Sequence, residues 1–359
     1  MQVKKNECES LMKKLLSKLL ILLAMTLLSG GRASSLSFNL DSIAAWGKFP
    51  RFCVNTYRWG DRFFNTYDST YVRGSGYKFN VKLTTDSWLD YYNFALPNHL
   101  RMNMMSDPST SVGVYATYLA VSVGYDINVS NLFQGTSQAR SRYRFGFDCS
   151  LLAVEVYLEN NDVGTKIKRF GNETDLSIPF KDIEIHSWGI DAYYFFNHKK
   201  YSQSAAFGFG RIQQKSHGSF FAGLSIYSQS YDFDFNGLPQ YMLDQIPEWW
   251  ADHHYKVKTR NYGLRLGYGY NWVFARHWTA GFHLSPTIGI RTGFVNSQDS
   301  NTDLSLMVRG KASVVWNNKR WFAGIVGRID SSIINDRKTT FMGHDMSLSA
   351  AIGYRFNLW

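Results

Sequence analysis

His283 and Ser285 lie two residues apart in a stretch of alternating apolar and polar residues, and as a pair they could perform acyl transfer. On a strand, residues i and i+2 point to the same side, so the imidazole and the hydroxyl would share one face. A nucleophilic serine needs a base within hydrogen-bond reach and usually a third group that orients this base. Pro286 follows the serine, and no acid or asparagine is evidently paired with the histidine. The spacing therefore fits two polar residues on the inner face of a strand equally well, without catalysis.

The segment QQKSHGS, residues 213–219, brings a lysine, two serines and a histidine together between two apolar stretches. We expect a turn here, with Gly218 supplying a positive φ angle. Lys215 offers an ammonium group to a partner or to a phosphate of lipopolysaccharide. The alternative is a solvated turn that binds nothing.

Five basic residues lie on or close to the polar face of successive strands expected late in the chain: Arg265, Arg291, Arg309, Lys311 and Arg328. If the strands enclose an open lumen, such a basic ladder would favour anionic solutes. If the lumen is filled, the same residues would pair with acids such as Asp303 and Asp191, because buried charges need partners. The sequence leaves both alternatives open, and we favour a filled or plugged lumen.

The elements that must position these residues are long strands. In YKFNVKLTTD, residues 77–86, the apolar Tyr77, Phe79 and Val81 alternate with polar residues. Residues 262–272 and 278–290 repeat this period of two, with aromatic or aliphatic residues on one face and small or polar residues on the other. Such alternation predicts β-strands. Aromatic residues make up 16% of the chain and only 7 residues are proline, as expected for a protein built mainly of strands.

Two all-β architectures use such strands. A soluble β-sandwich has strands of about 5–6 residues with polar residues facing water. A membrane barrel needs strands of about 9–11 residues, an apolar outside, aromatic girdles and a polar lumen. The expected strands are long, and Gly and Ser crowd their polar face. We therefore predict a transmembrane antiparallel up-and-down β-barrel of about 12 strands, with about 14 as the next choice. A secreted soluble β-sandwich is the alternative.

The strand pattern can be divided into segments, although their odd number cannot be right for a bacterial barrel, which has an even number. The segments are residues 77–87, 97–105, 111–126, 141–158, 163–170, 183–197, 201–213, 218–231, 257–273, 278–296, 304–316, 319–330 and 343–358. The short segments 97–105 and 163–170 are the least regular. Longer connections at 127–140, 171–182 and 232–256 are expected outside the cell.

The beginning of the chain predicts a secretory signal peptide. Two lysines precede an apolar run at 19–28 and small residues up to Ala33, which is the usual order of charge, apolar core and cleavage site. We assign the signal to residues 1–33, a periplasmic or plug segment to 34–76 and the barrel to 77–359. Removing the signal removes six basic and two acidic residues, so the formal charge falls from +11 to +7.

The remaining basicity indicates outer-membrane lipids, lipopolysaccharide or an anionic solute as partners. No cluster of Lys and Arg with interleaved aromatic residues predicts a nucleic-acid groove. Cys8 leaves with the signal, and an oxidising compartment would permit a disulfide between Cys53 and Cys149 without requiring one. No Cys or His residues have the spacing of a zinc site, since His253 and His254 are adjacent. We expect neither a metal nor a cofactor.

The chain ends on the strand pattern AIGYRFNLW instead of a polar tail. Tyr354, Phe356 and Leu358 alternate with small or polar residues, and Trp359 is one residue out of phase. We interpret the alternate apolar residues as the lipid face of the strand that closes the barrel, since lipid tolerates no unpaired strand edge. The ending also resembles the aromatic C-terminal signal through which the barrel-assembly machinery recognises barrel precursors.

Two stretches carry a resemblance to a known family. FNTYDSTYV, residues 64–72, and RIQQKSHGSFFAGLSIYSQ, residues 211–229, resemble the Bacteroides-type family known as domain of unknown function 4421. The residues that match its motifs are Tyr67, Asp68, Gln213, Lys215, Ser216, Gly218 and Ser219. Arg211 stands where the family has an acidic residue. The resemblance implies a signal peptide and an outer-membrane barrel, and it implies no chemistry.

These features together predict a porin-like, non-enzymatic β-barrel of the outer membrane of a Gram-negative bacterium, acting as a small pore or as a surface or assembly component. The first alternative is an outer-membrane lipid acyl hydrolase that uses His283 and Ser285. Its active pair would resemble that of outer-membrane acyl hydrolases, which usually have Asn after the serine, where this chain has Pro286.

Overall fold

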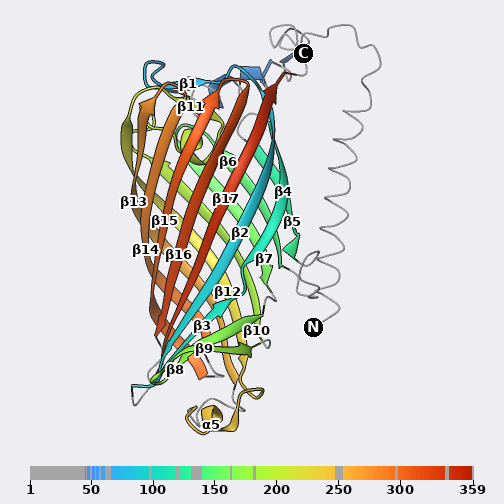
Figure 1. Cartoon of the computed structure of the whole chain (residues 1–359). Helices are drawn as coiled ribbons and strands as arrows, with labels where there is room; N and C mark the ends of the chain where they lie inside the picture. The colour runs from blue at the N-terminus through green and yellow to red at the C-terminus, as the bar shows by residue number, and fades with distance from the viewer. Residues whose placement is uncertain are drawn as a thin grey trace. The chain divides into compact units, whose positions relative to one another are not determined.

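Twelve antiparallel strands pair side by side and close into a barrel, which confirms the predicted architecture (Figure 1). This computed structural model describes short pieces within 45–60, and residues 66–357 without 97–98, 119–120, 131–139, 162–163, 181–182, 247–253, 296–297 and 336–338. In pairing order the wall strands are β2 (Phe79–Ala95), β4 (Ser109–Tyr118), β5 (Val121–Asn128), β6 (Arg140–Asp148), β7 (Leu152–Asn161), β10 (Ile183–Phe195), β12 (His217–Asp234), β13 (His254–Ala275), β14 (Trp278–Val295), β15 (Gln298–Asn318), β16 (Trp321–Asn335) and β17 (Thr340–Phe356).

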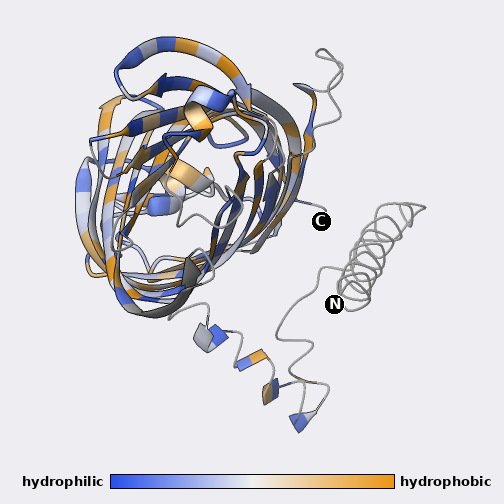
Figure 2. Ribbon diagram, turned by 90° about the horizontal axis from the view of Figure 1, so that it is seen from below, coloured by the Kyte–Doolittle hydropathy of each residue, from blue (hydrophilic) through white to orange (hydrophobic). Residues whose placement is uncertain are grey.

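The last strand closes the barrel on the first wall strand. β17 pairs with β2 along its whole length, from Phe356 beside Phe79 to Thr340 beside Ala95. Figure 2 looks along the barrel and shows the strands as a ring around short internal segments. We call the end with Phe79 and Phe356 the terminal end, and the opposite end the far end. Because one sheet closes on itself, the alternative of a soluble β-sandwich is wrong.

The alternation of side chains turns an apolar surface outward. On β13, Leu264 and Leu266 are 53% and 52% exposed, whereas Arg265 between them is 0% exposed and lies inside. Other large apolar residues exposed on the wall include Leu83, Val114, Ile127, Trp188, Ile190, Leu224, Tyr262, Trp272, Phe282, Leu284, Ile288, Ile290, Leu304, Ile325, Leu348 and Ile352. In water such a surface would cost about 25 cal/mol per Å². We conclude that the barrel spans a membrane, where this surface contacts lipid. Within the part of the chain that the structure describes, no helix has the length and apolar composition needed to cross a bilayer.

The far end is closed by an apolar cluster that we call the cap. The end of β2 leaves β4 and pairs with β3 (Arg101–Ser106), which pairs with β8 (Thr165–Phe170) and then β9 (Glu173–Phe180). A short helix, α5 (Gln240–Leu243), adds Met242. The buried side chains of the cap are Tyr92, Phe94, Leu96, Met102, Met104, Ile167, Phe170, Phe180, Ile183, Tyr231, Phe233, Phe235, Leu238, Met242, Ile246, Tyr255, Val257, Ile334 and Phe341.

The terminal end holds a segment that folds inward between β10 and β12. Residues 201–210, which we call the plug, include the π-helix η1 (Ser204–Gly208) and pack against β14 and β15. A Cβ at Gly281 would lie 2.4 Å from the Ala206 Cβ, so this glycine lets the plug approach the wall. The plug leads into β11 (Arg211–Gln213), which pairs with β1 (Val72–Gly74).

Five of the strand assignments need correction. Segment 201–213 is not a wall strand, because its small residues Ser204–Gly208 form the helical turn inside the barrel. Segments 97–105 and 163–170 contain β3 and β8, which lie outside the wall. Segments 111–126 and 141–158 each contain two strands, which are separated by two and three residues without Gly or Pro. These errors offset one another, so the predicted number of wall strands is still right.

Candidate functional site in the barrel lumen

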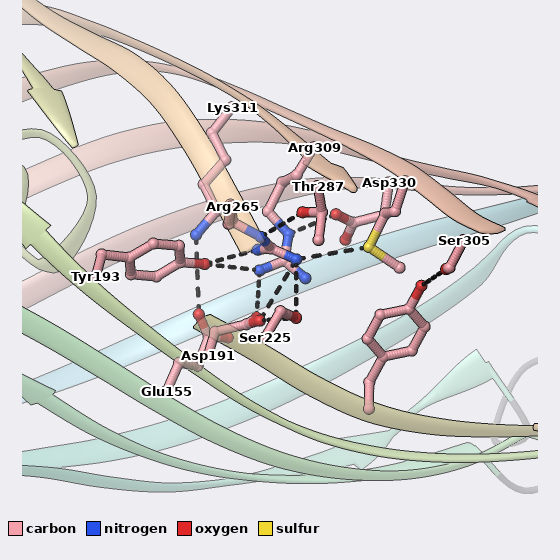
Figure 3. A network of polar contacts seen from close by, with 12 residues as sticks. Glu155, Asp191, Tyr193, Ser225, Arg265, Thr287, Ser305, Arg309, Lys311 and Asp330 are labelled. Atoms are coloured by element: carbon pink, nitrogen blue, oxygen red, sulfur yellow. Dashed lines mark hydrogen bonds and ion pairs between the residues drawn. The ribbon is translucent and has the colours of Figure 1, made fainter. Parts of the chain in front are cut away.

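The middle of the lumen is crossed by a layer of ion pairs, which we call the charged layer (Figure 3). Arg309 on β15 donates hydrogen bonds to Asp191 at 2.6 Å, to Asp330 at 2.5 Å and to the Tyr193 hydroxyl at 3.0 Å. Asp191 lies on β10 and Asp330 on β16, so one guanidinium joins distant parts of the wall. Asp191 and Arg309 are each 1% exposed. Charges buried this deeply require such pairing.

Arg265 is the second cation of this layer. It donates hydrogen bonds to Thr287 at 2.7 Å, to the Tyr193 hydroxyl at 2.8 Å and to Ser225 at 3.2 Å, and its Nη2 lies 3.4 Å from Asp191. The Ser225 hydroxyl in turn donates a 2.5 Å hydrogen bond to Asp191, so it links Arg265 to this carboxylate. The layer therefore combines charge neutralisation with hydrogen bonds to hydroxyl groups, and these contacts connect strands across the lumen.

The other members of the predicted basic ladder occupy different depths. Arg328 pairs closely with Asp330 and lies 3.7 Å from Glu155. Arg291 lies nearer the far end, 3.4 Å from Asp303, and donates to the carbonyl oxygens of Ile333 and Asn335. Lys311 lies 3.8 Å from Glu155. The ladder is thus a set of ion pairs, including pairs with Asp303 and Asp191.

A cavity of about 180 Å³ lies between the charged layer and the plug. We call it the chamber. Among the described residues, three cations and three carboxylates line it: Lys82, Lys311, Arg328, Asp86, Asp148 and Glu155. The plug contributes Gln203, Phe207, Gly208 and Phe209 to its lining. Smaller cavities of about 70 and 60 Å³, lined by residues such as Glu159 and Asp345, lie on the other side, towards the cap. The lumen is therefore divided into compartments.

His283 and Ser285 both face the lumen and are buried, at 3% and 0% exposure. The His283 ring stacks on Phe221 with 4.4 Å between centroids, and Tyr193 and Phe207 meet it edge-on. Among the described residues, neither imidazole nitrogen has a hydrogen-bond partner, and neither has the Ser285 hydroxyl. The pair therefore lacks both the nucleophile–base hydrogen bond and the orienting group that acyl transfer uses.

The plug is fastened to the wall by polar side chains that sequence reasoning did not single out, apart from Gln213. The Gln213 amide donates to the carbonyl oxygens of Lys200 at 2.7 Å and Lys215 at 2.9 Å, and its oxygen accepts from Asn271 at 3.0 Å. Asn271 also donates to the Ser202 carbonyl at 2.8 Å. Together they hold the plug to β13.

Arg355 fastens the other side of the plug. It is 1% exposed, it donates to Asn317 at 2.8 Å and to the Lys319 carbonyl at 2.5 Å, and it also bonds the Phe209 carbonyl. Its guanidinium lies 4.4 Å from the centre of the Phe322 ring. The available signal was a lone cation at a lumen-facing position of the closing strand, and a lone acid at a lumen-facing position of β16 was the corresponding signal for Asp330.

The two family stretches meet at the terminal end. Val72 pairs with Gln213, and the Arg211 guanidinium lies 5.1 Å from the centre of the Tyr67 ring. Asp68 accepts hydrogen bonds from the backbone and the hydroxyl of Thr70, which lower the pKa of its carboxyl group. The Asp68 backbone donates to the Lys199 carbonyl. These stretches therefore build the support of the plug.

The remaining motif residues are also structural in this arrangement. Lys215 is exposed, with its ammonium 5.4 Å from the centre of the Tyr71 ring. The Ser216 hydroxyl accepts from the Val273 backbone, and the Ser219 hydroxyl accepts from the Asn197 backbone. Gly218 does not have the positive φ angle that we expected. It lies in β12, where a Cβ would be 2.2 Å from the Tyr268 hydroxyl, so close packing explains the glycine.

The aromatic ending is described in part. Tyr354 packs on Trp321 at 4.7 Å and Phe356 stacks on Phe79 at 5.8 Å between centroids, while Leu358 and Trp359 lie outside the described residues. Cys149 is a buried free thiol in the turn after β6, and it bonds to the backbone of Leu152. Cys53 also lies outside the described residues. Among the described residues no group of His, Cys, Asp or Glu could hold a metal ion.

Residues 66–356 match the family described as Domain of unknown function (DUF4421). The chain belongs to this family. The match covers both family stretches apart from residues 64 and 65, and it ends with the closing strand. No curated protein matches the sequence.

Several solved outer-membrane barrels resemble the fold of this DUF4421 protein. They include the outer membrane protease OmpT from Escherichia coli, at 6% identity and a TM-score of 0.36, over 78% of this chain and 97% of that chain. The translocator domain of the autotransporter NalP from Neisseria meningitidis has 10% identity and a TM-score of 0.34, over 78% and 89%. The toluene transporter TodX from P. putida has 8% identity and a TM-score of 0.29, over 83% and 98%. Identities this low carry no information on activity, since one fold hosts many functions.

Proposed function

We propose that the protein is a non-enzymatic outer-membrane β-barrel that has no open channel in this state and acts as a surface or assembly component. The observation that carries this proposal is the closure of the lumen at both ends, by the plug and by the cap. The charged layer between them is neutralised by its own ion pairs, so it provides no free path of charges along which an ion would travel.

The lengths of the connections support an orientation. At the terminal end, β13 joins β14 between Ala275 and Trp278, and β15 joins β16 between Asn318 and Trp321. At the far end, β12 and β13 are separated by residues 235–253. Barrels of this class have short periplasmic turns and longer extracellular loops. We therefore propose that the plug faces the periplasm and the cap faces the cell exterior.

This orientation fits the partners expected from the sequence. Outer-membrane lipids contact the wall, and Lys215 at the periplasmic end can contact a phosphate. In the proposed scheme lipopolysaccharide surrounds the outer half, the signal at residues 1–33 is cleaved during export, and the barrel-assembly machinery recognises the ending that contains Phe356. Cell fractionation together with N-terminal sequencing of the mature protein tests this part of the proposal.

Conductance of the purified protein in planar lipid bilayers tests the closed lumen. We expect no steady current across the wild-type barrel at neutral pH. Steady, ohmic channels with uniform step size would overturn the proposal.

A small pore is the second candidate, because the chamber contains room and charge for a polar solute. Replacing residues 202–210 by a short Gly-Ser linker removes the plug and leaves the cap. Current that appears only in this variant would favour a gated pore, with an anionic solute as one substrate to examine. The absence of current in this variant as well would favour the non-conducting barrel.

Phospholipase assays address the hydrolase alternative. We expect wild-type protein and Ser285→Ala protein to release the same background level of fatty acid from phospholipid vesicles, because His283 and Ser285 are buried inside the lumen. Hydrolysis by the wild type that the Ser285→Ala variant lacks would contradict a non-enzymatic function.

A further inference from the structure

We propose that the chamber is a binding site for a small zwitterionic solute of amino-acid size, reached from the terminal end when the plug moves. This goes beyond the function proposed above, because binding in the chamber requires neither conduction through the barrel nor catalysis. The inference rests on the charges that line the chamber, on two of these charges that lack close partners, and on the composition of its plug side.

Lys311 provides a positive charge whose ion pair is long and includes no hydrogen bond. Its side chain is only 10% exposed, and the residue lines the chamber. The nearest acid, Glu155, lies 3.8 Å away, beyond hydrogen-bond distance, and no described residue accepts a hydrogen bond from the ammonium. An ammonium carries three donors. Arg328 stands beside it, with one nitrogen 3.7 Å from Glu155 and the other edge bonded to Asp330. Lys311 and Arg328 therefore present two cations to the carboxylate of a solute.

Asp148 provides an unsatisfied negative charge in the same chamber. Among the described residues, none donates a hydrogen bond to its carboxylate or forms a close ion pair with it, although the charges of Lys82 and Lys311 act on it through space. Gly208 of the plug leaves room there, since a Cβ on that residue would lie 3.0 Å from the carboxylate oxygen. Asp148 is therefore placed to accept the ammonium group of a solute.

The overall charge selects a zwitterion. Among the described lining residues, Lys82, Lys311 and Arg328 balance Asp86, Asp148 and Glu155, so this part of the lining has no net formal charge. A solute that is only an anion would satisfy Lys311 and leave Asp148 alone, and a solute that is only a cation would do the reverse. Burying an unpaired charge is costly. A molecule that carries both charges a few bonds apart satisfies both groups at once.

The size and apolar lining of the chamber limit the rest of the solute. One water needs about 10–15 Å³ of such volume, so about 180 Å³ holds on the order of ten waters or one small molecule. Apolar side chains line part of the wall: Ala153, Val154, Val326, Ala351, Phe207 and Phe209. The structure thus favours an amino acid with a small apolar side chain.

The plug side of the chamber explains how a solute would enter. Gln203 lines the chamber, and its side-chain oxygen has no donor among the described residues. The hydroxyl group of Tyr201 is likewise buried without a partner there. Unpaired polar groups weaken the contact of the plug with the wall. The plug is therefore the side from which the chamber opens.

Isothermal titration calorimetry with the full-length barrel in detergent micelles tests the proposal. L-Alanine is the zwitterionic probe, propionate is the anion-only probe and ethylamine is the cation-only probe. We expect saturable binding of L-alanine at least about tenfold tighter than of either other probe, as expected when one lost charge contact costs about 1.4 kcal/mol. Equal affinities for the three probes would overturn the proposal.

Three variants locate the site. Lys311→Met and Asp148→Asn should each weaken L-alanine binding by about tenfold, whereas Lys258→Met, the same change at an exposed lysine of β13, should not. Gln213→Ala loosens the plug without touching the lining. If the wild type does not bind L-alanine, this variant must bind it. The absence of binding to both the wild type and the Gln213→Ala variant would refute the proposal. Heat-modifiable migration on gels confirms that each variant is folded.

Discussion

The cap and the plug both close the lumen, but they differ in the number and kind of their contacts. The cap packs aromatic and aliphatic side chains from many wall strands, and Phe233 alone meets the rings of Tyr92, Phe94 and Phe341. The plug buries only a few apolar side chains, chiefly Tyr201 and Phe209, in small clusters, and hydrogen bonds from Gln213 and Arg355 also hold it. The large cluster of the cap opens only if many strands separate, whereas a short segment with fewer contacts can open locally. We therefore expect the plug, and not the cap, to be the end of the lumen that opens.

Weakening the cap should have the largest effect. Phe233 is 0% exposed, and Phe233→Ala should lower the free energy of unfolding by about 3–5 kcal/mol, because it leaves a cavity in an aromatic cluster. Urea unfolding in lipid vesicles measures this. Phe220→Ala is the control, since Phe220 is 68% exposed to lipid and should cost about 1 kcal/mol or less. Equal losses at both positions would show that the cap does not stabilise the barrel.

Removing the charged anchor of the plug should have the next largest effect. Hydrogen bonds from a charged group contribute about 1.5–3 kcal/mol, so Arg355→Met should speed amide hydrogen exchange in residues 201–210 by tenfold or more. Global unfolding should change less than in the cap variant. Arg320→Met is the matched control, because Arg320 is exposed and its guanidinium donates to the Tyr77 hydroxyl, away from the plug. Unchanged exchange in the plug would contradict the idea that Arg355 fastens it.

Removing the neutral anchor should have a smaller effect of the same kind. Gln213→Ala deletes neutral hydrogen bonds worth about 0.5–1.5 kcal/mol each, so exchange in residues 201–210 should rise by roughly tenfold. Gln214→Ala changes the exposed neighbour and should leave the plug unaffected. If both variants behave alike, the Gln213 side chain does not hold the plug.

The smallest effect is expected at Asp68, outside the membrane. The hydrogen bonds from Thr70 lower the pKa of this carboxyl group in the folded protein. Its contribution to stability is therefore present at neutral pH and is lost as the pH falls through the lowered pKa. Asp68→Asn and Thr70→Ala should each speed exchange in β1 slightly at pH 7. Neither should differ from the wild type at a pH below the pKa of Asp68, and a difference that persists there would exclude this titration as the cause.

The sequence predicted the barrel because period-two alternation is a local property. Leu264, Arg265 and Leu266 are assigned to the correct faces without any knowledge of their partners. The inward fold of the plug was not predictable in this way, because AAFGFG, residues 205–210, alternates small and aromatic residues as a wall strand does. The plug and a wall strand can be told apart only by the contacts that the segment makes inside the lumen, and the lumen forms only when the barrel closes. The short connections after Tyr118 and Asp148 were missed because they lack Gly and Pro.

In the candidate site, too, the orientation of side chains could be predicted from the sequence, whereas their contacts could not. The inward position of Arg309 could be predicted from its place among the polar residues that alternate along its strand. Its bond to Asp191, however, joins residues 118 positions apart and depends on how the sheet curves. His283 and Ser285 have the expected spacing and common face, yet what surrounds them is decided by Phe221 and Phe207 from other segments. The alternation of residues along a strand determines which side chains enter the lumen. The closing of the sheet into a barrel determines which of these side chains contact one another.

The position of Arg355 has a consequence for the order of assembly. Its side chain reaches the carbonyl of Phe209, in the middle of the chain, from β17, the strand that closes the barrel on β2. The plug therefore cannot be fully fastened until β17 has paired with its neighbours. A precursor that lacks its final strand would carry a loose plug as well as an open seam. Docking of the plug thus reports that the barrel is complete.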